Sequence, residues 1–385
     1  MPGLGLSEFA DILSRLESRA IQARPQQCTR LRHRLSTCTL CADVCPTGAI
    51  QWADGLVVDP EKCTGCGACA TVCPTGALVG QSPTDAELVA RIHGVVKESG
   101  NVAFACKRYL STKPVAAAVA VNCLARLDES LLVAAVAFGA KRVWLLDGSC
   151  GDCPEGTCRS VAEVCAGRAN RLLGAFGLEN RIALVPHLDV DVLTAFAETQ
   201  AEGMSRRGFF NMLVRQTARV GAITTDSVLT SQGLSAEKEM KKGELPTLMP
   251  EKRLLLLAAL KRLGRGSDGD HGAAGGLWNK FQFTETCTGC QMCAFFCPTG
   301  ALTKWEQDGR VGVAFQVSRC VACGLCRDSC YVKAVVLWDD VDLSVVLSET
   351  VEALPMRAAE AAPWRKSGSE GVARSILESL DLTNE

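Results

Sequence analysis

Short apolar runs alternate with longer amphipathic stretches between Asn101 and about Glu198. The short runs predict buried strands, and the stretches between them have the spacing of amphipathic helices. The predicted strands are Val102–Ala105, Val119–Asn122, Val143–Leu146 and Ile182–Val185. The predicted helices are Ser130–Phe138, Val161–Phe176 and Val190–Glu198. Strands that alternate with helices in this way predict an α/β domain with a parallel sheet.

Outside this region the apolar pattern predicts isolated helices. These are expected at Ser7–Arg19, Arg206–Gly221, Glu251–Leu263 and 373–382. The glycine-rich residues 264–276 have the composition of a flexible linker. We therefore expect a multidomain chain of mixed α/β and α+β class. Its predicted parts are an N-terminal helix (1–24), a first module (25–82), the α/β domain (83–200), a helical and glycine-rich linker (201–280), a second module (281–341) and a C-terminal tail (342–385).

Composition and charge exclude several classes of protein. The formal charge of −1 over 385 residues provides no field that would attract nucleic acid or an anionic membrane. The N-terminus has no secretory pattern, and the longest apolar run, Leu254–Leu260, is too short to span a bilayer. The segment MSRRGFF at 204–210 resembles a twin-arginine export signal, but it lies in mid-chain and is expected to begin a helix. We therefore expect a cytoplasmic protein, in which closely spaced cysteines are metal ligands or redox catalysts.

The 22 cysteines fall into three groups, at 28–73, 106–165 and 287–330. Two runs in these groups, Cys63–Pro74 and Cys287–Pro298, have the spacing CxxCxxCxxxCP and similar flanking sequences. In such a run the first three thiolates hold one 4Fe–4S cluster, while the cysteine before the proline ligates a different cluster. Each run therefore needs a partner run, and the chain contains two copies of one module.

The partner of the second copy lies at Cys320–Cys330, with Tyr331 in place of the proline. The partner of the first copy is Cys38–Pro46, whose missing ligand we assign to Cys28. Crossed ligation then predicts four clusters. Their ligand sets are Cys28, Cys38, Cys41 and Cys73; Cys63, Cys66, Cys69 and Cys45; Cys287, Cys290, Cys293 and Cys330; and Cys320, Cys323, Cys326 and Cys297.

These runs resemble bacterial dicluster ferredoxins over residues 25–80 and 281–340. Structural zinc is the alternative, since zinc also takes four thiolates, but zinc ribbons use two CxxC pairs and no third cysteine before a proline. The basic segment 28–35 lies beside a predicted cluster, where it either tunes the potential, docks an acidic partner or forms an ordinary solvated face.

The central cysteines follow the predicted strands. Cys106 and Cys123 end the first two strands, and Cys150 and Cys153 lie in the loop after the third. Because the carboxyl ends of parallel strands share one sheet edge, these thiols are expected to converge on a fifth site. A thiol pair at Cys150 and Cys153, or plain buried cysteines, are the alternatives. Cys165 lies inside a predicted helix and is expected in the core.

The sequences FACKRY at 104–109 and VNCLARLDESLLVAAVAFGAKRVWLLDGSCGDCPEG at 121–156 resemble the delta iron–sulfur subunit of the methyl-viologen-reducing hydrogenases. The resemblance implies a 2Fe–2S cluster on Cys106, Cys123, Cys150 and Cys153. It also implies partners of the hydrogenase, formate dehydrogenase or heterodisulfide-reductase type. Where the family has a second cysteine after Cys106, this chain has Lys107–Tyr109, so Cys158 is a reserve ligand.

No dinucleotide fingerprint, phosphate loop or nucleophile motif accompanies these cysteines. The sequence therefore predicts an electron-transfer subunit of a larger oxidoreductase, with four 4Fe–4S clusters and one central cluster. Whether the chain is itself an enzyme is left open: a disulfide reductase that uses Cys150 and Cys153 is one alternative, and a redox sensor or cluster-assembly factor is another.

Overall fold

The computed structural model describes residues 20–52, 55–115, 118–188, 245–264 and 276–358. The helices predicted at Ser7–Arg19, Val190–Glu198, Arg206–Gly221 and 373–382 lie outside these residues, as do MSRRGFF and most of the glycine-rich linker. Within the described parts of the chain, no helix is long and apolar enough to cross a membrane.

The central sheet is parallel, as predicted, with strand order β6-β5-β7-β8. Its strands are β5 (Val102–Cys106), β6 (Val119–Val121), β7 (Val143–Leu146) and β8 (Ile182–Val185). The helices of this region are α5 (Asp85–Ser99), α6 (Lys107–Thr112), α7 (Glu129–Ala137) and α8 (Arg159–Gly174), with 3-10 turns η2 (Leu124–Arg126) and η3 (Gly156–Cys158). Side chains alternate along β5: Val102 and Phe104 enter the main core, whereas Ala103 and Ala105 face a smaller cluster on the other side.

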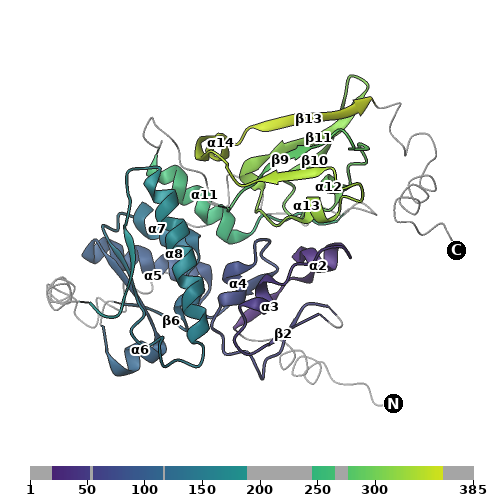
Figure 1. Cartoon of the computed structure of the whole chain (residues 1–385). Helices are drawn as coiled ribbons and strands as arrows, with labels where there is room; N and C mark the ends of the chain where they lie inside the picture. The colour runs from purple at the N-terminus through teal and green to yellow at the C-terminus, as the bar shows by residue number, and fades with distance from the viewer. Residues whose placement is uncertain (1–19, 53–54, 116–117, 189–244, 265–275, 359–385) are drawn as a thin grey trace, which may run out of the picture.

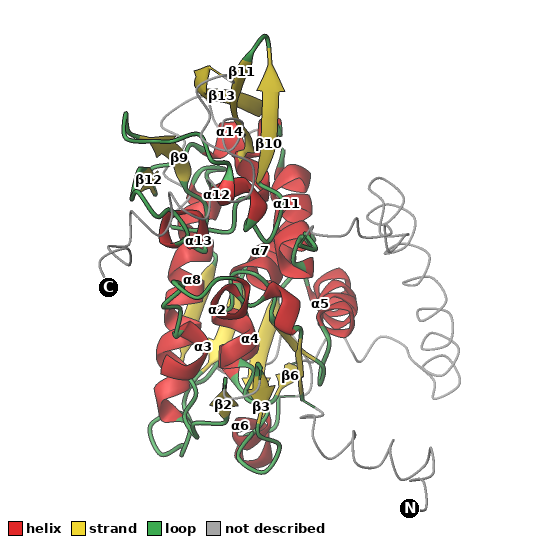
Figure 2. Cartoon of the chain, turned by 90° about the vertical axis from the view of Figure 1, so that its right-hand side faces the viewer, coloured by secondary structure: helices red, strands yellow, loops and turns green. Residues whose placement is uncertain are grey.

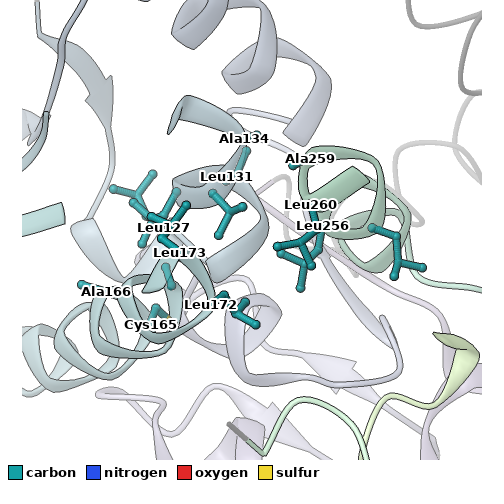
Figure 3. Close-up of a cluster of buried hydrophobic side chains, with 14 of the residues drawn as sticks. Leu127, Leu131, Ala134, Cys165, Ala166, Leu172, Leu173, Leu256, Ala259 and Leu260 are labelled. Atoms are coloured by element: carbon teal, nitrogen blue, oxygen red, sulfur yellow. The ribbon is translucent and has the colours of Figure 1, made fainter. Parts of the chain in front are cut away.

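Helix α7 is buried on nearly every side because it lies between the sheet domain and a further helix, α11 (Glu251–Leu263). Figure 3 shows Leu131 and Ala134 of α7 facing Leu256 and Leu260 of α11. The bounds of α11 agree with the prediction. Its position as part of the α/β core was not predicted from the sequence.

The first module has a short strand at each end and a hairpin in its middle. Strand β1 (Ile21–Ala23) pairs antiparallel with β4 (Leu78–Gly80), and β2 (Ile50–Gln51) pairs with β3 (Val57–Val58). Between them lie η1 (Pro25–Gln27) and the short helices α2 (Thr29–Arg32), α3 (Leu40–Asp43) and α4 (Ala68–Val72). The cysteine runs occupy the segments between these strands.

The second module repeats this order. Strand β9 (Lys280–Phe283) pairs antiparallel with β12 (Val335–Trp338), and the middle hairpin is β10 (Leu302–Gln307) with β11 (Arg310–Gln316). Helices α12 (Met292–Phe295) and α13 (Leu325–Asp328) and the turn η4 (Val317–Arg319) complete it. Helix α14 (Leu343–Ser348) and strand β13 (Val351–Ala358) follow, and β13 joins the edge of β11.

The three parts lie against one another (Figures 1 and 2). Helix α11 connects all of them. Arg262 donates to the carbonyl of Ala137 at the end of α7 (2.9 Å), while Lys261 pairs with Glu349 beyond α14 (2.8 Å). Lys252 donates to the carbonyls of Ala70 and Thr71 in α4, at 3.0 and 2.7 Å. The arrangement therefore places both cysteine-rich modules against one scaffold.

Candidate metal centres

The structure brings Cys28, Cys38, Cys41 and Cys73 together around one pocket, as crossed ligation predicts. These cysteines come from the start of α2, the loop before α3, α3 itself and the end of α4. Burial, followed by the neighbouring Cys73, Cys38 and Cys28, raises the pKa of the Cys41 thiol to about 12. The walls are otherwise mainly apolar, with Leu40, Trp52, Leu56, Pro74, Ala77 and Leu78.

A second pocket in the same module is lined by Cys45, Cys63, Cys66 and Cys69. Burial raises the pKa of Cys69, and Cys66, Cys63, Cys41 and Cys45 add to the effect. Cys41 belongs to the first set, so the two sets are neighbours. The backbone N–H of Ala49 lies 3.3 Å from the Cys45 sulfur, a hydrogen bond of the kind that tunes cluster potentials.

In the second module, Cys297, Cys320, Cys323 and Cys326 line a pocket walled by Phe281, Ala301, Leu302, Phe315 and Leu337. The remaining set is Cys287, Cys290, Cys293 and Cys330. Burial raises the pKa of Cys293, and the other three thiols raise it further, which shows that they lie near it. Backbone N–H groups of Gly289 and Ala334 approach the sulfurs of Cys287 and Cys330 at 3.4 and 3.2 Å. Each predicted set in this module is thus brought together.

The donor sets fit 4Fe–4S clusters. Each set offers four thiols, and the sets that line pockets lie among mostly apolar walls. In three of the four runs the last cysteine is followed by the proline that is typical of crossed ligation. Among the described residues, no three or more Cys, His, Asp and Glu side chains form a group that could hold a single metal ion. A cubane cluster places its thiolates at four corners, farther apart than around one ion, so wide thiol sets suit it.

The central thiols also converge on one edge of the sheet. Burial, followed by the neighbouring Cys123, Cys106, Asp147 and Cys153, raises the pKa of Cys150 to about 11. Cys106 caps α6, accepts from the N–H of Tyr109 (3.4 Å) and lies 3.6 Å from the Ser149 hydroxyl. The predicted set of Cys106, Cys123, Cys150 and Cys153 is therefore a spatial group, which one cluster or a thiol pair could use.

Cys158, which the sequence offers as a reserve ligand of the central site, lies beside Cys123 of that set and beside Cys66 of the first module. It is fully buried at the start of α8 and lies between the first module and the central thiols. A hydrogen bond from the Cys158 thiol lowers the pKa of Cys66 to about 6, and the same thiol lowers the pKa of Cys123. Cys158 thus connects a ligand of the first module with one of the central set. Cys165, by contrast, is in the core of α8, as predicted.

Two buried arginines lie beside the set of Cys297, Cys320, Cys323 and Cys326. Arg32 comes from α2 of the first module and has Cys297 and Cys323 nearby; Arg253 comes from α11 and has Cys320 nearby. Each guanidinium has one buried nitrogen without a hydrogen-bond partner among the described residues, Nη2 in Arg32 and Nη1 in Arg253. Sequence reasoning missed both, because each lies in a run of charged or apolar neighbours that gives no sign of burial.

The five thiol sets form a series through the molecule. Cys66, Cys158 and Cys123 connect the central set to the first module, and Cys41 neighbours Cys69 within that module. The pKa of Cys323 is raised by burial, then by Cys297 and Cys320, and also by Cys38. Since Cys38 belongs to the first module and Cys323 to the second, the two modules meet at the thiol sets that contain them. Within the second module, Cys293 likewise neighbours Cys326.

Comparison with known families agrees with these sites. A 4Fe-4S binding domain matches residues 56–79, and a 4Fe-4S dicluster domain matches residues 286–334. No solved structure matches the chain. The first match covers the run Cys63–Cys73 of the first module, and the second covers both runs of the second module. The protein therefore contains ferredoxin-type domains that bind 4Fe–4S clusters, which are carriers for electron transfer.

Proposed function

We propose that this chain is an electron-transfer subunit of a larger oxidoreductase, with four 4Fe–4S clusters in its two modules and one further cluster, of 2Fe–2S type, in the α/β domain. The ligands would be the four sets named above and the central set of Cys106, Cys123, Cys150 and Cys153. When bound, the clusters would supply one-electron carriers of low potential. The observation that carries the proposal is the series of neighbouring thiol sets from Cys106 to Cys287.

The chain's own residues support conduction rather than conversion of a metabolite. Apolar side chains line the two thiol sets of the first module, and backbone N–H groups approach the sulfurs of Cys45, Cys287 and Cys330. Donors of this kind stabilise the reduced form of a cluster and so set its potential. The resemblance of residues 104–156 to the hydrogenase delta subunit supports partners of the hydrogenase, formate dehydrogenase or heterodisulfide-reductase type.

A disulfide reductase that uses Cys150 and Cys153 is less well supported. A thiol catalyst needs a lowered pKa, whereas burial raises the pKa of both thiols, and the Cys153 thiol donates to the Glu155 carboxylate (3.1 Å). Cys150→Ser separates the two functions. In the relay it removes one spectroscopic centre together with about two iron atoms. In a thiol catalyst it leaves the iron content unchanged and abolishes disulfide reduction.

The relay is tested by anaerobic titration of the full chain with reduced methyl viologen, followed by optical and EPR spectroscopy. We expect the chain to take up about five electrons, one for each cluster, and to return them to an oxidised viologen. Uptake of about two electrons, or uptake that accompanies reduction of an added disulfide, would contradict a relay. Copurification with a hydrogenase, formate dehydrogenase or heterodisulfide-reductase-like subunit tests the partners.

A further inference from the structure

The step from Cys28 to Cys38 is the irregular part of the first module. A regular run places two residues between these ligands, whereas this chain places residues 29–37 there. These residues form α2 and the loop that follows it. Figures 1 and 2 both show α2 directly beside α13 of the second module. The extended step therefore lies at the contact between the two modules.

Arg32 is the principal contact of this segment. It is 8% exposed, although it stands in a run of basic residues whose neighbours Arg30 and Arg34 are exposed. Its Nε donates to the carbonyl of Phe296 (3.2 Å), and its Nη1 donates to the carbonyls of Pro246 and Gln26 (both 2.8 Å). One side chain thus connects the first module, the segment before α11 and the second module.

The contact leads directly to a cluster ligand, because Phe296 precedes Cys297 in the chain. His33 reinforces it by packing edge to face on the Phe296 ring, with 4.5 Å between centroids. At the same interface, Cys38 of the first module neighbours Cys323 of the second. The segment therefore holds two ligand sets of different modules next to each other.

The charge of Arg32 is incompletely paired by protein groups. Its Nη2 is buried and has no hydrogen-bond partner among the residues that the structure describes, and all three acceptors of its other nitrogens are neutral carbonyls. A buried cation needs an anionic or strongly polar partner, since desolvation without one is costly. Cys297 and Cys323 lie near enough to interact with the Arg32 charge, and both become anionic once they bind iron as thiolates.

We propose that residues 29–37 are an intermodule clamp, in which Arg32 fixes the first module to the second and places its positive charge beside the cluster of Cys297, Cys320, Cys323 and Cys326. This inference rests on the proposed function, because it requires clusters at both sites. The clamp has two consequences. It fixes the separation of the two clusters that meet at the interface, and it raises the potential of the second-module cluster, since reduction adds a negative charge beside a buried cation.

Arg32→Gln tests the clamp in the full-length, cluster-loaded chain. The change removes the charge and the fork of donors, so we expect a lower midpoint potential for one cluster and a loss of the magnetic interaction between two reduced clusters in the EPR spectrum. Arg34→Gln is the matched control, because it removes the same charge from an exposed position two residues away. We expect it to leave both properties unchanged.

Arg32→Lys separates charge from geometry. Lysine keeps the positive charge but cannot donate to three carbonyls from a planar fork. We expect a midpoint potential close to that of the native chain and a weakened magnetic interaction. Potentials and spectra of Arg32→Gln that equal those of Arg34→Gln would overturn the clamp. The iron content of the native chain is measured first. If the native chain holds no iron–sulfur clusters, the proposed function fails rather than the clamp.

Discussion

The buried ion pair between Arg126 and Asp85 gives the sharpest stability prediction. Arg126 lies in η2, three residues after Cys123, and is 4% exposed. Its Nη2 pairs with the Asp85 carboxylate at the start of α5 and donates to the carbonyl of Pro83 (3.2 Å). The side chain also covers Gly67, where an added Cβ would lie 2.6 Å from the Arg126 Cδ. Arg126 therefore connects the segment that follows Cys123 of the central set with the loop that contains Cys66 and Gly67.

Replacing Arg126 with methionine leaves the Asp85 carboxylate, whose side chain is 18% exposed, without its cation. Loss of one partner of a buried pair costs about 3–5 kcal/mol, and the partial exposure of Asp85 favours the lower value, about 3 kcal/mol. The measurement is anaerobic urea unfolding of the cluster-loaded chain, in which the midpoint should fall at an unchanged slope.

The matched control is Arg24→Met. Arg24 also connects the first module to another part of the chain, through Glu251 at 3.0 Å, but the side chains of this pair are 28% and 56% exposed. We expect a loss of no more than about 1 kcal/mol there. If Arg126→Met and Arg24→Met destabilise the protein equally, the account of the buried junction is refuted.

Three further predictions follow from packing and ligation. Gly67→Ala should destabilise the chain by about 1–3 kcal/mol in the same unfolding assay, because Gly67 has φ +82° and its Cβ would collide with Arg126; a change below the error of the assay would contradict this. Leu260→Ala should cost about 2–5 kcal/mol, since Leu260 is fully buried between α11 and α7; a loss below about 1 kcal/mol would show that α11 is only a linker. Cys28→Ala should remove about four iron atoms by colorimetric analysis, whereas Cys165→Ala should remove none; equal iron contents would exclude Cys28 as a ligand.

The elements with strong periodicity were predictable. Strands β5, β7 and β8 and helix α11 agree with the apolar pattern to within a residue, because each is long or apolar enough for one period to dominate. The grouping of the cysteines in space followed from their spacing as well, since that spacing suits the shape of a cluster; their role as ligands stays a prediction. Structure brings all of these predicted sets together.

The contacts between the parts could not be predicted. The burial of Arg32 depends on Phe296, which is 264 residues away in the sequence, and a helix of four residues is too short to show an apolar face. Strand β13 was missed for a different reason. Pro355 argues against a strand because proline has no N–H to donate. However, β13 lies at the edge of its sheet, and its pairing with β11 shifts in register between Val311 and Gly312, next to Pro355. The missing N–H is therefore tolerated.

Iron and sulfide analysis of the anaerobically purified full chain, combined with EPR of the reduced protein, tests the central claim most directly. The account predicts about 16 iron atoms from the two modules and about two more from the central set, with sulfide in a matching amount. Zinc in place of iron, or about eight iron atoms per chain, would contradict it.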